Sequence, residues 1–327
     1  MAVPDAHIVT FPAESLRSLV WDGDDLVDWA GGGVIYKPTG ERTSRNRFYA
    51  YAFDGAVADG RDAVIFARLN TKGLVLRDGL LLREIDRSFY CADAFDYPLA
   101  VFRRKDGRQI LAHCPKAVDR LELEDFTTGD ILTAWADRQP RSNFHGRLAA
   151  SSDGRYLLSA GWAWQPYDDI LVFDLDEALA EPSHLDSKGI LPSLWSEMGA
   201  CAAFSRDGRL IVGLNIDGED RGSQDHTGLC VFDLDSRVMT GEVRCSGPIG
   251  LLMAIGDHHV LNLHGHPQLL DLATGEVVRA WPGVPCGNQI SAIRAASPPF
   301  EHIAIDVDRM RCAIGLGDRI TVIRFES

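Results

Sequence analysis

The chain has 327 residues, of which 46% are hydrophobic and 24% are charged, and its formal net charge is -14. This composition is ordinary for a globular protein with a large core, and it excludes a chain that is mostly disordered. The excess of carboxylates repels phosphate backbones and anionic lipid surfaces, so we expect neither a nucleic-acid partner nor a membrane surface.

The first apolar segment, His7–Phe11, is expected to form a strand that precedes the first repeat. From there, an Asp-Gly turn followed by an apolar run recurs along the chain. It begins at Asp22, and four copies of Asp-Gly-Arg follow at spacings of 47, 47 and 54 residues, starting at Asp59, Asp106, Asp153 and Asp207. Weaker copies near Asp257 and Asp308 bring the series to seven repeats.

Each repeat is expected to be a meander of antiparallel strands. Asp-Gly between two β-rich runs favours a tight hairpin, because glycine adopts positive φ without the clash of a Cβ atom. Neighbouring apolar residues such as Leu157 and Leu158 make both strand faces apolar, as happens when each small sheet packs between two others. The repeat length therefore predicts an all-β fold, a seven-bladed β-propeller of four-stranded antiparallel blades, as a single domain over residues 1–327.

The last repeat supplies three apolar runs and is one strand short. We therefore predict that the N-terminal strand His7–Phe11 closes the C-terminal blade as its outer strand. It would pair with Ile320–Phe325 and leave few open sheet edges.

Three short sequences carry a resemblance to a known family: VFDL at Val172–Leu175, VFDL at Val231–Leu234 and LLDL at Leu269–Leu272. They stand where WD40 repeats have their Trp-Asp pair, and over nearly its whole length the chain resembles the WD40 family in its loose bacterial form. The Gly-His pair of that family and its buried Asp-His-Ser/Thr-Trp network are not recognisable. The resemblance implies the propeller fold rather than a particular function.

Function is expected among the longer loops. If the strands of a blade are named a to d, the Asp-Gly turns join a to b, and the b–c and d–a connections meet at the opposite end, here called the long-loop face. We assign to it Arg138–Gly146, Gly161–Asp169, Ser183–Gly199, Asp217–His226 and His264–Pro267. The predicted binding residues are the aromatic and polar side chains of these loops: Phe144, His145, Trp162, Trp164, Tyr167, Trp195, Asp217, Glu219, Asp220, His226, His264 and His266. Trp162 alternatively covers the end of its own blade.

Metal chemistry is the less favoured interpretation of the same loops. Asp217, Asp220, Asp225 and His226 could offer oxygen and nitrogen ligands, but their spacing does not match a calcium-binding loop. His264 and His266 flank a glycine and lack a spaced third ligand. We therefore expect no cofactor and no tightly bound metal.

The seven cysteines are scattered and never spaced C-x-x-C, so most are expected to be small buried side chains. The first residues contain no basic leader, and no apolar run is long enough to span a bilayer. These features favour a cytoplasmic location.

Two classes of function compete. The favoured one is a non-catalytic scaffold, a monomer by itself, that binds a basic protein partner through the long-loop face. An immunity protein that neutralises a bacterial toxin is one setting for such a binder. The alternative is a metal-dependent hydrolase or lactonase with its site at the central channel, but the innermost strands, at Gly146–Ser151 and Gly199–Ser205, carry small apolar residues instead of convergent ligands. This favours binding over catalysis.

Overall fold

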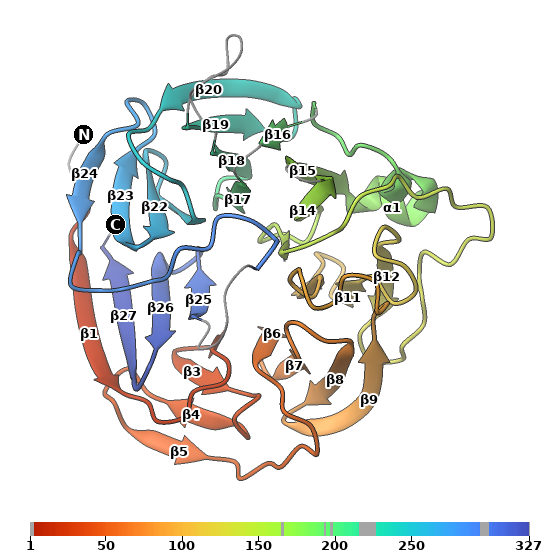
Figure 1. Cartoon of the computed structure of the whole chain (residues 1–327), viewed down its shortest axis with the longest axis horizontal. Coiled ribbons are helices and arrows are strands. Elements are labelled where there is room, and N and C mark those ends of the chain that lie inside the picture. The colour runs from red at the N-terminus through yellow and green to blue at the C-terminus, as the bar shows by residue number, and fades with distance from the viewer. Residues whose placement is uncertain are drawn as a thin grey trace. The chain divides into compact units, whose positions relative to one another are not determined.

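The computed structural model describes residues 3–164, 167–192, 194–196, 199–215, 227–294 and 301–326. Within these residues the strands form seven antiparallel sheets, six with four strands and one with three (Figure 1). The fold is an all-β, seven-bladed β-propeller, as predicted. The chain divides into two compact units, a terminal unit of residues 5–132 and 301–326 and a middle unit of residues 133–294. That residues 1–327 act as a single domain stays a prediction.

The terminal unit holds four blades, each in the order in which its strands pair. The first is β2 (Val20–Asp22), β3 (Asp25–Asp28), β4 (Val34–Tyr36) and β5 (Arg42–Ser44), and the second is β6 (Gly55–Asp59), β7 (Asp62–Phe66), β8 (Lys72–Arg77) and β9 (Leu80–Asp86). The third is β10 (Leu99–Arg103), β11 (Gln109–His113) and β12 (Glu122–Asp125), and the last is β25 (His302–Asp306), β26 (Arg311–Leu316), β27 (Arg319–Phe325) and β1 (Ala6–Pro12). In the third blade a single bridge between Glu124 and Ile131 stands where a fourth strand would lie.

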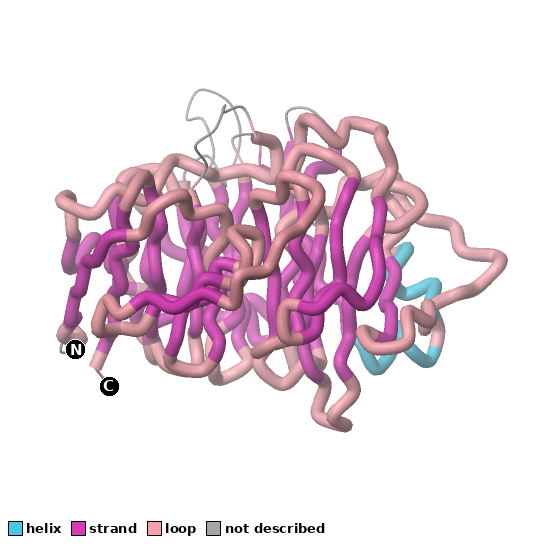
Figure 2. Tube along the Cα trace, turned by 90° about the horizontal axis from the view of Figure 1, so that it is seen from below, coloured by secondary structure: helices cyan, strands magenta, loops and turns pink. Residues whose placement is uncertain are grey.

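The middle unit holds three blades of four strands. They are β13 (Leu148–Ala150), β14 (Tyr156–Trp164), β15 (Tyr167–Asp174) and β16 (Leu194–Ser196); β17 (Ala200–Phe204), β18 (Arg209–Leu214), β19 (Gly228–Asp233) and β20 (Val238–Arg244); and β21 (Leu251–Ile255), β22 (His259–His264), β23 (His266–Asp271) and β24 (Val277–Ala280). Between β15 and β16 lie the helix α1 (Leu175–Ala180) and the 3-10 helix η1 (Pro182–Asp186), drawn in cyan in Figure 2.

The predicted closure by the N-terminal strand is confirmed. β1 pairs antiparallel with β27 from Ala6 opposite Phe325 to Pro12 opposite Arg319. The hydroxyls of Thr10 and Thr321 lie 3.0 Å apart across this pair. Each Asp-Gly turn likewise joins strand a to strand b of its blade. At Gly60, for example, φ is 63°, a conformation that glycine adopts without the clash of a Cβ atom.

The core explains why the strands are apolar on both faces. One cluster joins Trp29 of the first blade to Ile65 and Leu76 of the second, and another joins Leu158 and Val172 of the fourth blade to residues of the fifth. Neighbouring sheets within each unit are therefore packed face to face through apolar side chains. Five of the seven cysteines are buried, as predicted, and none forms a disulfide.

One predicted loop assignment is wrong. Most of Ser183–Gly199 lies in the c–d connection of its blade, which is the one that contains η1. Successive strands of a meander run in opposite directions, so a c–d connection lies at the same end as the Asp-Gly turns. Only the residues after β16 belong to the long-loop face. In the part of the chain that the structure describes, no helix is long and apolar enough to cross a membrane.

Candidate functional site

The predicted aromatic site lies at the long-loop end of the fourth blade. Trp162, at the end of β14, exchanges backbone hydrogen bonds of 2.7 and 2.9 Å with Phe144. The two rings lie 4.5 Å apart between centroids, and Phe144 is buried. Trp162 and Tyr167 are half-buried. Trp162 thus covers the end of its own blade, which was the alternative interpretation, while part of its surface stays open to solvent.

His145 is buried in a small polar network of the same blade. Its Nδ1 lies 3.0 Å from the Ser159 hydroxyl, and its ring centroid lies 6.0 Å from that of Phe173. Only a histidine and a serine of the Asp-His-Ser/Thr-Trp set are present here, because Phe173 stands beside His145 instead of a tryptophan. Because His145 and Ser159 are both fully buried, this pair cannot reach a substrate.

Several predicted residues are not placed. Asp217, Glu219, Asp220, Asp225 and His226 lie outside the described residues. The backbones of Trp164 and Trp195 belong to β14 and β16, but their side chains are also outside the described part. Their role at the long-loop face remains a prediction.

His264 and His266 face each other across a tight turn at Gly265, so their side chains lie on the same side of the hairpin. Burial and the nearby His266 lower the pKa of His264. Among the described residues no group of three or more His, Cys, Asp or Glu side chains is arranged to hold a metal ion. Gly265 is bridged instead to Gly287, to whose carbonyl it donates at 2.6 Å.

Gly287 belongs to a strap, residues 286–293, that follows β24 and contacts all three blades of the middle unit (Figure 1). Besides Gly265 of the sixth blade, it meets the fifth blade, where the Cys201 thiol donates to the Ile290 carbonyl at 3.3 Å. On the fourth blade the Ser291 hydroxyl donates to the Asp168 carboxylate at 2.9 Å. The strap therefore covers the long-loop ends of these blades near their inner strands.

Two buried carboxylates follow each other on β15. Asp168 accepts hydrogen bonds from Ser291 and from the Ala200 amide, and Arg147 Nη2 lies 3.8 Å away. Asp169 is fully buried, and within the described residues its oxygens accept no side-chain hydrogen bond. Its partner is Arg141, whose Nη2 lies 3.7 Å away. Burial raises the pKa of both carboxyls. The sequence signal for these buried carboxylates is a pair of consecutive acidic residues inside an apolar strand. No prediction was drawn from that pair.

Asp169→Asn is expected to stabilise the protein at neutral pH. A raised pKa means that the folded state binds protons more tightly than the unfolded state above the ordinary aspartate value of 3.8, so the charged carboxylate costs stability at neutral pH. The gain should shrink as the pH falls towards 3.8. Thermal melts at several pH values measure it, with the exposed Asp257→Asn as control. A variant that is equally destabilised at every pH would contradict the prediction.

Exposed aromatic side chains that the sequence analysis passed over lie in the terminal unit. Phe89 and Tyr90, in the d–a connection after β9, are 84% and 61% exposed. Tyr51, in the connection after β5, is also exposed, and its hydroxyl accepts from Asn70 Nδ2 at 3.0 Å. The same Asn70 accepts from Arg87 through its carbonyl at 2.8 Å. We call Tyr51, Phe89 and Tyr90 the aromatic platform; all three lie in loops of the long-loop face.

Arg87 anchors the loop that carries Phe89 and Tyr90. Its guanidinium is buried and donates six hydrogen bonds to five carbonyls, those of Arg68, Asn70, Ala92, Phe95 and Asp96. The charge also lies 4.8 and 4.7 Å from the ring centroids of Phe95 and Tyr97. Burial lowers the pKa of Arg87 to about 10, which still leaves it charged at neutral pH. The loop that displays Phe89 and Tyr90 is thus fixed before any partner binds.

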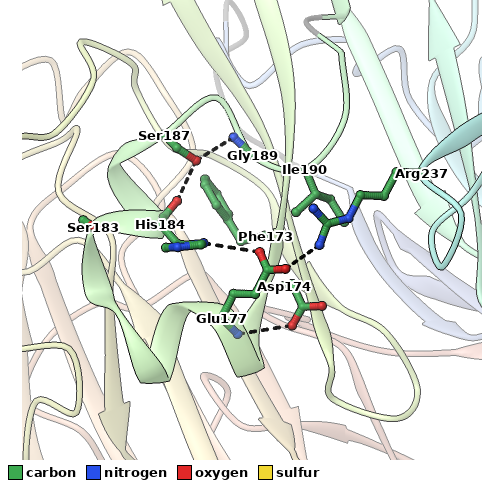
Figure 3. A pocket seen from close by; sticks show the side chains of 9 residues that line it. All are labelled: Phe173, Asp174, Glu177, Ser183, His184, Ser187, Gly189, Ile190 and Arg237. Carbon is green, nitrogen blue, oxygen red and sulfur yellow. Dashed lines mark hydrogen bonds and ion pairs between the residues drawn. The ribbon is translucent and has the colours of Figure 1, made fainter.

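A cavity of about 400 Å³ lies at the opposite end of the middle unit, beside α1 and η1 (Figure 3). Its residues are Phe173, Asp174, Glu177, Ser183, His184, Ser187, Gly189, Ile190 and Arg237. Glu177 stands at the centre, between Arg237 and His184 Nδ1, which is 3.3 Å away. The hydrogen bond from Arg237 lowers the pKa of Glu177. Within this cavity, Glu177 is therefore already paired with Arg237 and contacts His184.

No protein-family model matches the chain, and no curated protein matches it significantly. Solved structures do. A chain in the crystal structure of the mitotic checkpoint complex is 11% identical with a TM-score of 0.60, and the match covers 99% of this chain and 92% of that one. The propeller domain of Cps50 (Swd1) from Myceliophteria thermophila is 14% identical with a TM-score of 0.56, over 97% and 99% of the two chains. Streptogramin B lyase is 9% identical with a TM-score of 0.58, over 98% of each chain.

These likenesses show the fold alone. They include an enzyme as well as a member of a protein complex, so function must be argued from the residues of this chain. Membership of the WD40 family remains a prediction.

Proposed function

We propose that this protein is a non-catalytic scaffold that binds a protein partner through its long-loop face. The observation that carries the proposal is the aromatic platform. Exposed aromatic side chains grouped on one surface are typical of binding sites, and tyrosine is common among the residues that dominate interface energies. A loop already ordered by Arg87 loses little conformational entropy when a partner binds.

The partner is proposed to be basic. The net charge of -14 attracts cationic proteins, and the exposed Asp93 lies in the same loop as Phe89 and Tyr90. An immunity protein that neutralises a basic toxin is a narrower form of this hypothesis. The likeness to a chain of the mitotic checkpoint complex supports a role in a protein assembly. A metal-dependent hydrolase or lactonase stays the alternative; streptogramin B lyase is an enzyme of another reaction class with a similar fold.

Replacing Phe89 or Tyr90 by alanine is expected to weaken partner binding by about 2 kcal/mol each, roughly thirtyfold in Kd, while the fold stays intact. The experiment compares proteins captured from source-cell lysate by the full chain and by each variant, followed by Kd measurement with the captured protein. Trp135→Ala, at a half-exposed tryptophan of the middle unit, is the matched control. If capture is unchanged by Phe89→Ala and Tyr90→Ala but is lost on substitution of Trp162, Trp164 or Trp195, the binding site lies on the middle unit instead.

A further inference from the structure

The outer strand of the second blade, β9, carries the largest run of exposed leucines among the described strands at sheet edges. It is seven residues long and begins with three exposed leucines, Leu80, Leu81 and Leu82. Outer strands are commonly kept short or polar, because their free N–H and C=O groups can pair with another chain. β5, the outer strand of the preceding blade, follows that rule with three exposed polar residues.

A bulge contributes to this exposure. The pairing of β8 with β9 shifts between Val75 and Leu76, which face Arg83 and Leu81, so Leu82 is the extra residue. An extra residue bends the strand and leaves its own side chain outside the regular alternation. Leu81 lies opposite Leu76 and therefore on the side of the sheet that packs against the first blade.

Phe48, whose side chain is 91% exposed, belongs to the loop that contacts the start of β9. The residues around it are fixed: Arg45 forms an ion pair with Asp78, and the Tyr49 hydroxyl donates to the Gly79 carbonyl at 3.2 Å. Asp78 and Gly79 directly precede Leu80. Phe48 and the three leucines therefore belong to segments that meet at the start of the strand, and we call these four residues the β9 margin.

Charge differs between the two ends of β9. Beside Leu80 lie four arginines, Arg45, Arg47, Arg61 and Arg77. Their acidic neighbours are the ion-pair partners Asp62 and Asp78, together with Asp125, whose charge acts on Arg77. Hydrogen bonding by Arg45, with the charges of Arg61 and Arg47, lowers the pKa of Asp78. At the other end, Glu84 and Asp86 face a single lysine, Lys72. The start of the strand is locally positive in a chain that is strongly negative, and its end is negative.

We propose that β9 binds an extended segment of a partner protein by strand addition, with apolar side chains on the β9 margin and carboxylates beside the arginines at the Leu80 end. Main-chain hydrogen bonds supply the pairing in such complexes, and alternate side chains supply the specificity. This surface lies along the outer edge of the blade and shares no residue with the aromatic platform.

In the register that pairs all seven residues, a second copy of this chain fits the strand poorly. Antiparallel pairing of β9 with itself about Arg83 would place Leu80 opposite Asp86 and Leu82 opposite Glu84, so that leucines would meet carboxylates and Arg83 would meet Arg83. Arg83 already pairs with Glu124 of the next blade. A foreign segment with the opposite charge order avoids these conflicts.

The backbone direction identifies where to interrupt the pairing. The Arg87 amide donates to the Thr71 carbonyl at 3.0 Å, so the N–H and C=O groups of Asp86 and Glu84 point away from β8. Glu84→Pro therefore removes an outward donor without removing a bond to β8. Glu84→Gln keeps that donor and removes only the charge.

The test uses a library of random displayed peptides, long enough to pair with all of β9, selected on the full chain. Enriched peptides should have an apolar residue at every second position and carboxylates at one end. Fluorescence anisotropy with a synthesised peptide should show binding weakened about tenfold or more by Leu81→Ser and by Glu84→Pro. Glu84→Gln should bind nearly as the parent does. Val238→Ser on β20 is the matched control, since Val238 and Leu81 are both 54% exposed.

Three results would overturn the proposal: no enriched peptide, enriched peptides whose binding ignores Leu81→Ser and Glu84→Pro, or a dimer of the chain that Leu81→Ser dissociates. Melting temperatures show whether each variant is folded. Phe89→Ala should leave peptide binding unchanged, so failure of this proposal and failure of the platform proposal are distinguishable.

Discussion

Deletion of residues 1–12 is expected to lower the free energy of unfolding by about 5 kcal/mol and the melting temperature by roughly 10 °C. The deletion removes β1, which pairs with β27 over seven residues. It also removes Phe11, a buried ring whose centroid lies 6.3 Å from that of Tyr36 in the next blade. The loss exposes the long apolar edge of β27 to solvent. Differential scanning calorimetry of the two proteins is the measurement.

Single substitutions separate the packing from the strand pairing in this result. Phe11→Ala alone should cost about 3 kcal/mol, the usual range for a large aromatic removed from a core. His7→Ala, on the same strand but exposed, should be nearly neutral. If the shortened protein melts like the full chain, β1 does not hold its blade together.

The fold could be predicted from the sequence because the decisive signals are local. Each Asp-Gly pair specifies a hairpin by its own backbone preferences, and five such turns with two weaker copies count seven blades. The closing strand could be predicted by counting, since a blade with three strands needs a fourth. The position of α1 and η1 was missed because a long, aromatic-rich segment looked like a functional loop, whereas the number of preceding strands decides at which end it lies.

The candidate surfaces could not be predicted in the same way, because exposure is a tertiary property. Phe48 and Phe89 are written with the same letter as the buried Phe66 and Phe95, and only packing separates them. The tryptophans in long loops lie in the middle unit, so the sequence pattern pointed there and not to Phe89 and Tyr90. In the sequence Arg87 resembles a surface arginine, but in the structure five carbonyls from two segments of the chain, residues 68–70 and 92–96, converge on it.

Substitution of Arg87 is the second change for which a large effect is expected. Two energies oppose each other at this residue. Burial of the guanidinium disfavours its charged form, as its lowered pKa shows, and six hydrogen bonds to carbonyls offset that cost. Arg87→Met removes the charge and leaves the carbonyls without their donor, at about 1–3 kcal/mol for a buried unsatisfied group. Arg87→Lys keeps a buried charge but has three donors without the planar fork, so it cannot serve five acceptors.

We therefore expect both variants to be destabilised by about 3 kcal/mol or more, with Arg87→Lys at least as unstable as Arg87→Met. Chemical denaturation measures the loss, and Arg103→Lys, at a half-exposed arginine of the same unit, should change little. Amide hydrogen exchange should accelerate in residues 88–96 of both Arg87 variants, since the loop would lose its anchor. If Arg87→Lys were as stable as the parent, the carbonyls would not depend on the guanidinium fork. Arg87 would then not be what orders the loop of the aromatic platform. If stability fell while exchange in the loop stayed slow, Arg87 would support the blade but not the aromatic platform, and partner binding should then survive the substitution.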